Sequence, residues 1–379
     1  MNVLLVGLGR WGEKHRRVLA ELGVTVWAAD VSAERRAWAA KNGVDPSRVV
    51  ADVAAALGRV DAVDIVTPAD THLEIASRCL SAGKDCFVEK PLAQTVAEAR
   101  RLTDVVAETG RILQVGHIFR FHPVTDALCR CLVEGRVGRV RYLTARFAGF
   151  KRPRTDVGVT QTDAIHYFDL FAYLLGRAPT AVTALLRDYL GRGLDDLAFV
   201  TVEYGEVPAI VEAGYFVPGT HRDCLIVGER GSLVADFGRS VVTVFGHQHQ
   251  RAGGQWTARE GEQEELKATG EEPLRRELEA FLEAVATRRR PAVDVEAGLL
   301  ALRVVEAAQL SSRLGRRSAT AGWLCADPRS SAGFARAIFL AWGEVSEGAG
   351  TRASTPEAWG GLGGPPPRFQ AGLKRRTSS

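Results

Sequence analysis

The chain has 379 residues, 46% of them apolar, which is enough for two hydrophobic cores, and no apolar run is long enough to cross a membrane. Its formal net charge is only +4, and most of that excess lies after residue 320, where there are seven Lys or Arg and four Asp or Glu. The rest of the chain is nearly neutral, so a nucleic acid is not expected as a partner. The first apolar run starts at Asn2 and leaves no room for a signal peptide, so we expect a cytoplasmic protein without a membrane partner.

An apolar run, a glycine-rich turn and a helical pattern follow one another at the start of the chain. They predict a buried strand over residues 2–6, the turn Gly7-x-Gly9-x-x-Gly12 and a helix over residues 11–22. Gly7 permits the tight turn, Gly9 lets the backbone approach a pyrophosphate, and Gly12 lets the helix pack closely on its strand. The helix N-terminus adds unpaired amides and a partial positive charge. The pattern is typical of a dinucleotide site, although an ordinary glycine-rich turn is the alternative.

The second predicted strand, over residues 24–29, ends at an acidic residue, Asp30. A carboxylate at this place accepts hydrogen bonds from both ribose hydroxyls of the cofactor and repels a 2′-phosphate, so we favour NAD over NADP. Arg35 and Arg36 follow a few residues later and offer an alternative, because they would hold the 2′-phosphate of NADP. We expect them instead on a solvated helix face.

Strands and helices continue to alternate up to residue 119, which predicts an α/β Rossmann domain with a doubly wound parallel sheet. Thr95 and Glu98 form a capping box that opens one of the helices, and Gly110 ends it. Ligands bind such sheets beyond the carboxyl ends of the strands. That edge should therefore carry the residues that follow three of the strands: Thr67-Pro68, Glu89-Lys90 and Gly116-His117.

Lys90 follows the short buried run of residues 86–88 and precedes Pro91. A lysine before a proline most often anchors a turn, and this is the plain alternative to a function. Its place at a strand end on the cofactor side favours a catalytic amine instead, because hydride transfer needs a polar group at that edge. Pro91 restricts the backbone of Lys90 towards extended conformations and helps to aim the side chain.

The pattern changes after His122, where longer strands of alternating polarity predict a mostly antiparallel sheet. The residues from Gly228 to Gly231 lie between two such runs and predict a hairpin turn. Two amphipathic helices, over residues 274–286 and 295–314, are expected to pack on this sheet. After Arg317 the periodicity gives way to Gly, Ala, Ser and Pro, which predicts a disordered tail.

A further helix is predicted over residues 163–175, and it carries a histidine near its start. Asp163 and His166 are three residues apart, so their side chains can share one helix face and act near one another. Asp169 and Tyr173 extend the polar stripe. A histidine among aromatic residues is more often a packing residue than a catalytic one, so the sequence pattern alone leaves both alternatives open.

Five motifs in a fixed order resemble those of the Gfo/Idh/MocA family, which takes its name from glucose-fructose oxidoreductase, inositol dehydrogenase and rhizopine catabolism. The resemblance spans about residues 1–317 and implies a Rossmann domain at 1–119, an α+β domain at 120–318 with the substrate site and oligomer contacts, and a tail at 319–379. The motifs are Gly7-Leu8-Gly9-Arg10-Trp11-Gly12, Thr67-Pro68-Ala69-Asp70-Thr71-His72, Glu89-Lys90-Pro91, Gly116-His117-Ile118-Phe119-Arg120-Phe121-His122-Pro123 and Ala164-Ile165-His166-Tyr167-Phe168-Asp169.

The resemblance also implies which residues form the sites. We expect the cofactor to be held by Gly7, Leu8, Gly9, Arg10, Trp11, Gly12, Asp30, Thr67, Pro68, His72, Glu89, Lys90 and His117. We expect the substrate to meet Arg120, Arg152, Thr162, Asp163 and His166. Many members carry an acid four residues before the histidine, where this chain has Thr162, so Asp163 either replaces that acid or faces elsewhere.

Lys90, His166 and Asp163 are the expected catalytic residues of an alcohol oxidation. Lys90 would donate to the nicotinamide ribose and to the reacting hydroxyl, which orients the alcohol and stabilises negative charge as it develops. His166 titrates near neutral pH when unperturbed, so it is the preferred base, with Lys90 as the alternative in a dry, cationic site.

The His-x-x-Asp pattern at His166 and Asp169 resembles the branch that acts on nucleotide-linked sugars. We therefore expect an NAD-dependent dehydrogenase of a UDP-N-acetylglucosamine-like substrate, of the 3-dehydrogenase type. Arg120, Arg152 and Arg154 would meet a diphosphate or carboxylate, since planar guanidinium groups suit both. The alternatives are an inositol or polyol dehydrogenase, a glycoside-processing oxidoreductase with tightly bound cofactor, and an NAD-sensing scaffold protein.

Two further expectations concern metals and assembly. The six cysteines form no C-x-x-C pair, and His247-Gln248-His249 has no acid or cysteine nearby, so we expect no metal and assign these histidines to a polar loop or exposed strand. A homodimer or homotetramer is expected, because an exposed antiparallel sheet face commonly pairs.

Overall fold

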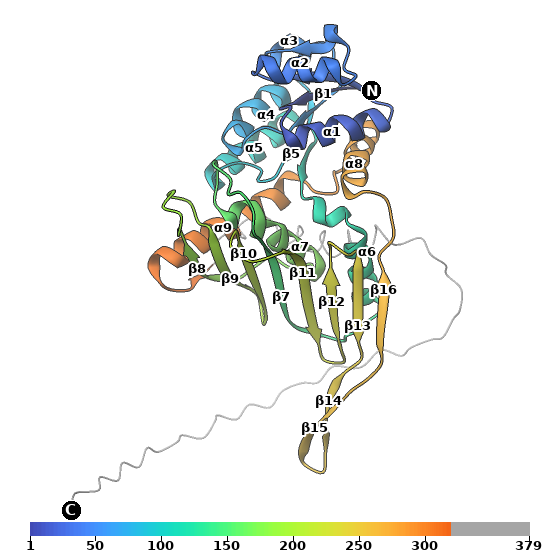
Figure 1. Cartoon of the computed structure of the whole chain (residues 1–379), viewed down its shortest axis with the longest axis vertical. Coiled ribbons are helices and arrows are strands. Elements are labelled where there is room, and N and C mark those ends of the chain that lie inside the picture. Colours follow the sequence, from blue (N-terminus) through green and yellow to red (C-terminus); the bar gives the residue numbers. More distant parts are fainter. Residues whose placement is uncertain (320–379) are drawn as a thin grey trace, which may run out of the picture.

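Six short parallel strands form the first sheet of the structure, a computed structural model that describes residues 1–319. The strands are β1 (Asn2–Val6), β2 (Thr25–Ala29), β3 (Val49–Val50), β4 (Ala62–Ile65), β5 (Asp85–Glu89) and β6 (Leu113–Gly116). Their order is β3-β2-β1-β4-β5-β6, so the chain reverses its direction of travel between β3 and β4. Helices surround this sheet in the upper part of Figure 1. The predicted doubly wound Rossmann sheet is confirmed.

The helices between these strands begin and end where the sequence signals place them. The capping box is formed: the Thr95 hydroxyl accepts a hydrogen bond from the Glu98 backbone amide at 3.2 Å, and the Glu98 carboxylate accepts one from the Thr95 backbone amide. Gly110 ends the same helix in the left-handed conformation. The elements are α1 (Arg10–Glu21), α2 (Ala33–Lys41), η1 (Pro46–Arg48), α3 (Ala54–Leu57), η2 (Ala69–Thr71), α4 (His72–Ser81) and α5 (Val96–Thr109).

A nine-stranded sheet forms the second half of the molecule (Figure 1). Its strands are β7 (Val140–Gly149), β8 (Ala181–Arg187), β9 (Leu197–Tyr204), β10 (Val207–Gly214), β11 (Thr220–Gly228), β12 (Ser232–Asp236), β13 (Val241–Phe245), β16 (Gln263–Lys267) and β17 (Ser318–Ala319). Their order is β16-β13-β12-β11-β7-β10-β9-β8-β17. The predicted hairpin joins β11 to β12. The strands are mostly antiparallel as expected, but β7 and β10 at the centre run parallel, which alternating polarity cannot reveal.

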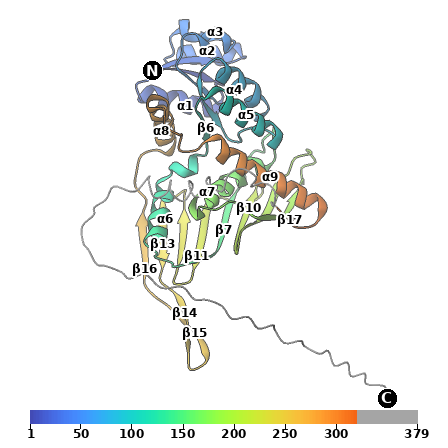
Figure 2. The same ribbon diagram turned by 180° about the vertical axis from the view of Figure 1, so that it is seen from behind.

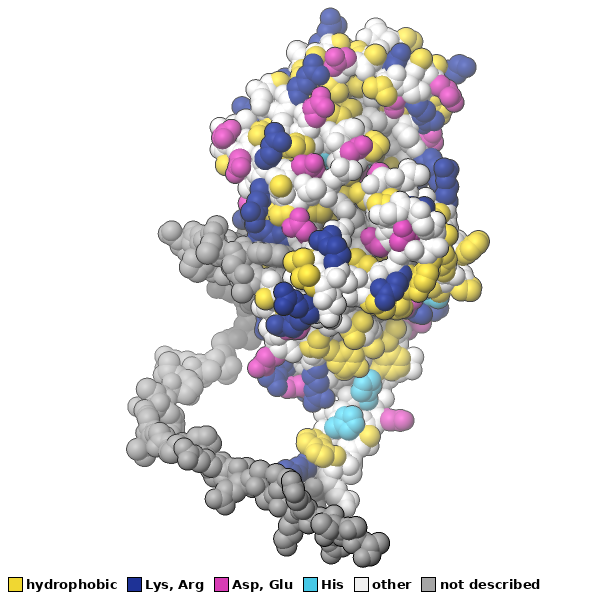
Figure 3. Space-filling view, turned by 90° about the vertical axis from the view of Figure 1, so that its left-hand side faces the viewer, with side chains coloured by type: hydrophobic (Ala, Val, Ile, Leu, Met, Phe, Trp, Pro, Cys, Tyr) yellow, Lys and Arg dark blue, Asp and Glu magenta, His cyan; other side chains and the backbone are white. Residues whose placement is uncertain are grey.

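Within residues 1–319, helices cover one face of the second sheet and leave the other face open (Figures 1 and 2). The elements on the covered side are η3 (Ile118–Phe121), α6 (Pro123–Val133), the π-helical turn η4 (Thr160–Ala164), α7 (Ile165–Leu175) and α9 (Val295–Leu314). Several large apolar side chains of the sheet are exposed, each by 40–47%: Tyr142, Leu185, Phe199, Ile210 and Val234. Hydrophobic side chains are visible over the sheet domain in Figure 3. An apolar sheet face of this kind is a candidate contact surface.

Helix α8 (Pro273–Thr287) does not pack on the second sheet, which corrects the expectation from the sequence. It lies beside α1 in both ribbon views (Figures 1 and 2). Its apolar side chains Leu278 and Phe281 belong to the same buried cluster as Val3 and Leu5 of the Rossmann sheet. Amphipathic periodicity predicts that a helix buries one face, but it does not say against which sheet.

The segment after α8 ties the two halves together. Val115 of β6 donates its amide to the carbonyl of Val293 at 2.9 Å, and Gln114 forms a bridge with Asp294. Helix α9 then packs against α5 of the Rossmann domain and against β8 of the second sheet. The Rossmann domain is therefore completed by residues that lie far beyond position 119.

A two-stranded hairpin, β14 (Gln248–Ala252) and β15 (Gln255–Arg259), projects from the end of the second sheet (Figure 1). It contains His249, while the neighbouring His247 lies 3.1 Å from the hydroxyl of Ser232. Within residues 1–319, His, Cys, Asp and Glu side chains form no group of three suited to a metal ion. In the same range, none of the helices has the length and apolar character needed to span a membrane. The predicted tail, from residue 320 onward, lies outside the described residues.

Candidate active site

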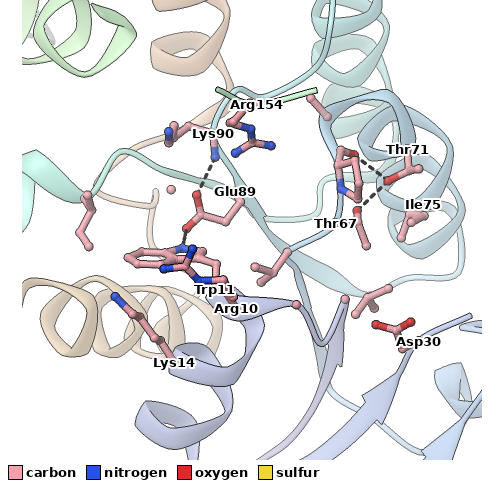
Figure 4. Close-up of a pocket in the computed structure, with 18 of the residues that line it drawn as sticks. Arg10, Trp11, Lys14, Asp30, Thr67, Thr71, Ile75, Glu89, Lys90 and Arg154 are labelled. Atoms are coloured by element: carbon pink, nitrogen blue, oxygen red, sulfur yellow. Dashed lines mark hydrogen bonds between the residues drawn. The ribbon is translucent and has the colours of Figure 1, made fainter. Parts of the chain in front are cut away.

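A cavity of about 1460 Å³ lies between the carboxyl edge of the Rossmann sheet and the second domain. Its walls include residues that follow β1, β2, β4 and β5, and others from η3, β7, α7 and β11. Figure 4 shows the Rossmann side, with Asp30 at one end and Lys90 and Arg154 towards the other. The position agrees with the rule that ligands bind beyond the carboxyl ends of parallel strands.

The glycine turn after β1 has the shape that a dinucleotide needs. Gly7 has a φ of +93°, and a Cβ there would lie 2.5 Å from the carbonyl oxygen of Val66. A Cβ on Gly12 would lie 2.0 Å from the carbonyl oxygen of Gly7, so the helix and turn pack too closely for a side chain. A Cβ on Gly9 would meet nothing within 4 Å, and Gly9 lines the cavity. The space above the turn is thus open to a pyrophosphate group.

Asp30 lines the cavity at the end of β2, as the sequence predicts. Its carboxylate accepts from the amides of Leu8 at 2.7 Å and Ser32 at 2.8 Å, which fixes its orientation. Arg35 was expected on a solvated helix face, but its Nε donates to the carbonyl oxygen of Leu8 at 2.5 Å and its guanidinium pairs with Glu13 at 2.5 Å. Arg35 also lines the cavity, because the turn of α2 brings it back over the glycine turn.

Of the other residues expected to hold the cofactor, Arg10, Trp11, Thr67, Pro68, Glu89 and Lys90 line the cavity. Leu8 is fully buried, and it contributes its backbone to the turn. The ring nitrogens of His72 lie 2.9 Å from the carbonyl oxygens of Thr67 and Pro91, so this side chain ties two loops together behind the cavity. His117 is buried, and its Nδ1 lies 3.9 Å from Asp169. Neither His72 nor His117 lines the cavity.

Lys90 reaches from the end of β5 to the second domain. Its ammonium group donates to the carbonyl oxygen of Thr162 at 2.7 Å, and the Lys90–Pro91 peptide bond is cis. Burial lowers the pKa of Lys90 to about 8, although Glu89 and Asp163 favour the charged form. An amine whose pKa lies close to neutrality can donate or accept a proton at physiological pH.

His166 lies in the first turn of α7, directly after the π-helical turn η4. Its ring stacks against two phenylalanines, with centroid distances of 4.9 Å to Phe119 and 5.1 Å to Phe147, and these two rings also contact each other. Burial lowers the pKa of His166 well below its usual value, and the charge of Lys90 acts in the same direction. The imidazole is therefore neutral at physiological pH and able to accept a proton.

Lys90 and His166 meet at the same cavity, one from each domain. The ammonium group of Lys90 is hydrogen-bonded to the carbonyl oxygen of Thr162, which lies one helical turn before His166. Asp163 also lines the cavity, but its ion pair, at 2.6 Å, is with Lys151. Three of the expected catalytic groups thus share one site, and the acid is paired with a lysine that the sequence patterns did not single out.

Two cationic side chains of this wall were missed from the sequence. Lys151 and Arg222 line the cavity together with Arg154, and Arg222 lies over the ring of Phe147 at 3.5 Å. Arg222 stands on β11, far along the chain from every motif, so a sequence pattern had no reason to select it. Arg154 forms a two-pronged ion pair with Asp156, at 2.8 and 2.5 Å, and Lys151 is paired with Asp163. The three cations therefore exceed these two carboxylates by one, and this excess suits an anionic ligand.

Three residues expected to meet the substrate do not line the cavity. Arg120 forms a two-pronged ion pair with Asp169, at 2.8 and 2.5 Å. Arg152 is exposed and is not part of the cavity wall, whereas its neighbours Lys151 and Arg154 are. Thr162 offers its carbonyl to Lys90, and its hydroxyl lies 3.2 Å from that of Tyr215. These three therefore support the site from behind or lie away from it.

Comparison with known proteins agrees with this geometry. Residues 1–117 match the Gfo/Idh/MocA profile described as an oxidoreductase family with an NAD-binding Rossmann fold. Residues 130–320 match the profile of the C-terminal alpha/beta domain of the same oxidoreductase family.

Individual relatives extend the similarity over both domains. The UDP-N-acetylglucosamine 3-dehydrogenase of Acidithiobacillus ferrooxidans is 31% identical over 301 residues, which is 79% of this chain and 93% of that one. A solved structure of that enzyme superposes with a TM-score of 0.72 at 27% identity, and the match covers 83% of this chain and 98% of the other. The inositol 2-dehydrogenase 2 of Saccharopolyspora erythraea is 33% identical over 248 residues, or 62% of this chain and 72% of that one.

Proposed function

Because the chain belongs to the Gfo/Idh/MocA family, and is an NAD(P)-dependent oxidoreductase that acts on CH–OH groups, we propose that it oxidises a secondary hydroxyl of a nucleotide sugar with NAD. The substrate would resemble UDP-N-acetylglucosamine, and the hydroxyl would be the one on carbon 3. The observation that carries the proposal is the meeting of Lys90 and His166 at one cavity, beside a cationic wall.

The cofactor would be held by the glycine turn, Asp30 and the loop at Thr67 and Pro68. When bound, NAD supplies the nicotinamide ring that accepts a hydride from the substrate carbon. Asp30 would accept hydrogen bonds from the ribose hydroxyls and repel a 2′-phosphate. The open space above Gly9 leaves room for the pyrophosphate.

Lys90 and His166 have different roles towards the reacting hydroxyl of the substrate. The ammonium group of Lys90 donates to the reacting hydroxyl and stabilises the negative charge that develops on its oxygen. His166 is neutral, so its free ring nitrogen takes the proton from that hydroxyl. Phe119 and Phe147 hold the imidazole in one orientation and keep water away from it.

The charge of the substrate end favours a nucleotide sugar over an uncharged polyol. Lys151, Arg154 and Arg222 line this end. Asp163 pairs with Lys151 and Asp156 with Arg154, which leaves the charge of Arg222 in excess. A diphosphate supplies the negative charge that such a wall binds. The inositol dehydrogenase relative keeps a polyol as the second candidate substrate. Reduction of NAD with UDP-sugars and with inositols, measured side by side, distinguishes the two.

Neighbouring arginines offer a matched test of this wall. Arg154→Met is expected to raise KM for the UDP-sugar roughly tenfold or more, because a charge-assisted contact to the diphosphate is lost. Arg152→Met should leave KM unchanged, since that side chain lies outside the cavity wall. Steady-state kinetics of both variants give the answer. Equal effects of the two substitutions would contradict the placement of the diphosphate.

Cofactor choice provides a second prediction. The wild-type protein should use NAD with a kcat/KM roughly tenfold or more above that for NADP, because Asp30 repels a 2′-phosphate. Asp30→Ser removes this charge while Arg35 remains beside the glycine turn, so the preference should shrink or reverse. The ratio of kcat/KM for the two cofactors is the measurement. A wild-type preference for NADP would overturn the role given to Asp30.

The open face of the second sheet supports a proposal about assembly. We expect a homodimer or homotetramer in which this face is buried, because its exposed apolar side chains include Phe199 and Ile210 on neighbouring strands. Ile210→Glu places a charge at the centre of the face and should reduce the mass in light scattering to that of a smaller species. Trp256→Glu, on the projecting hairpin, is the control for a surface change alone. A monomeric wild-type protein would refute the proposal.

A further inference from the structure

Behind the cavity, three charged side chains form a buried line in the core of the Rossmann domain. The Nδ1 of His15 lies 2.9 Å from the Asp64 carboxylate, and its Nε2 lies 3.3 Å from the carboxylate of Glu89. Asp64 and His15 are fully buried, and Glu89 is 7% exposed. We call Asp64, His15 and Glu89 the buried triad. The reaction described above makes no use of its two inner members.

Glu89 connects the buried triad to the reacting end of the cavity. Its Oε1 accepts from the indole of Trp11 at 2.6 Å, and its Oε2 accepts from the backbone amide of Lys90 at 3.1 Å (Figure 4). A Cβ on Gly116 would lie 3.0 Å from the Glu89 carboxylate, so glycine at that position makes room for it. The carboxylate is thus held in one place beside Lys90.

His15 acts against burial at both carboxyls of the buried triad. At Asp64 burial prevails and the pKa is raised, although His15 pulls it down. Burial opposes the charged imidazole, yet Asp64 and Glu89 raise the pKa of His15 to about 10, so it is cationic at neutral pH. Burial also opposes the charged form of Glu89, but His15 and Lys90 hold the pKa of that carboxyl below its usual value. Glu89 is therefore an anion whose charge favours the protonated form of the Lys90 amine, and the imidazolium behind Glu89 keeps it ionised.

We propose that His15 and Asp64 are positioning residues of the enzyme, which act through Glu89 to fix the charge beside Lys90 and so decide at which pH that lysine gives up its proton. The inference rests on the proposed role of Lys90 in the reaction. Its geometric basis is the unbroken series of contacts from Asp64 through His15 and Glu89 to Lys90.

Other titratable and charged groups face the two ends of this series of contacts. His15 faces Asp64 from β4, Glu89 from β5 and Glu277 from α8. Burial raises the pKa of Glu277 well above its usual value, which favours its neutral form. The groups that act on Lys90 are Glu89, Asp163, Arg154 and Lys151, and Lys90 in turn acts on His117 and His166. Among those groups, Glu89 is the strongest that keeps Lys90 protonated.

The consequence of removing the imidazolium follows from these charges. In His15→Gln, Glu89 loses its inner cation while its burial remains, so it takes up a proton more readily. Lys90 then loses the anion that favours its charged form, and it should give up its proton at lower pH. Loss of a nearby opposite charge lowers the pKa of an amine by ~1 unit or more.

The titration of Lys90 can be followed without any substrate. The wild-type protein and its variants are treated briefly with acetic anhydride at a series of pH values, and acetylation of Lys90 is quantified by digestion and mass spectrometry. We expect a midpoint of about 8 for the wild-type protein. In His15→Gln the midpoint should fall by ~1 unit or more, and in Glu89→Gln by at least as much. Asp64→Asn should shift it in the same direction but less.

Glu277→Gln is the matched control, because burial favours the neutral form of this acid near His15 and the amide has the same size. Its midpoint should equal that of the wild-type protein. An unchanged midpoint in His15→Gln, with a lowered one in Glu89→Gln, would overturn the proposal and leave only a packing role for His15. Should His15→Gln fail to fold by circular dichroism, Asp64→Asn decides in the same way. Because the assay needs no sugar, its result is independent of whether the proposed substrate is correct.

Discussion

Lys90→Met is expected to reduce kcat by roughly 10³-fold or more while the protein remains folded. The substitution keeps a linear side chain but removes the only group that reaches from the end of β5 to the carbonyl of Thr162 on the substrate side among the described residues. Without it, the reacting hydroxyl loses its donor and the developing charge loses its stabilisation. Lys41→Met, on an exposed helix, is the control and should leave kcat unchanged. Steady-state rates of NAD reduction test both.

The pH dependence of kcat/KM examines the same residue. Burial lowers the pKa of Lys90 to about 8, so its donating form is present below that pH and is lost as the pH rises through it. We expect kcat/KM to fall above about pH 8. Lys90→Arg keeps the charge at all accessible pH values, so this fall should disappear even if the rate is low. A rate that instead rises through pH 8 would make Lys90 the base and remove that role from His166.

His166→Ala is expected to reduce kcat by roughly 10²-fold to 10⁴-fold and to leave NAD affinity within about twofold of wild type. The imidazole takes the proton from the hydroxyl, whereas the expected cofactor contacts lie on the Rossmann domain. His249→Ala, on the projecting hairpin, is the control. Because the pKa of His166 lies well below its usual value, the neutral base persists on acidification, and kcat/KM should show no fall near pH 6.5. Near-normal turnover in His166→Ala would remove the base assignment.

The Rossmann half could be predicted from the sequence because its signals are local. Gly7, Gly9 and Gly12 fix the turn through backbone geometry, and the capping box at Thr95 fixes a helix start. Such features depend on residues a few positions apart, which the sequence shows directly. Lys90 was predicted at the site for the same reason, since the end of a parallel strand defines its place.

What the sequence could not reveal depends on contacts between distant segments. Helix α8 has a clear amphipathic pattern, but only the fold shows that it completes the Rossmann core. Arg222 and Lys151 join the site because β11 and β7 are paired next to α7, and no motif marks them. No motif marks His15 either, and only the fold shows that it is fully buried against Asp64. These assignments require the tertiary structure.

The most direct test of the account is the appearance of NADH when the purified protein is mixed with NAD and UDP-N-acetylglucosamine. We expect NADH to accumulate in solution with the UDP-sugar, and NADPH to accumulate more slowly when NADP replaces NAD. With Lys90→Met, NADH should form roughly 10³-fold more slowly or not at all. Accumulation with myo-inositol but with no UDP-sugar would contradict the proposed substrate. Full activity of Lys90→Met would contradict the account at its centre, because the meeting of Lys90 and His166 at one cavity would then have no part in the reaction.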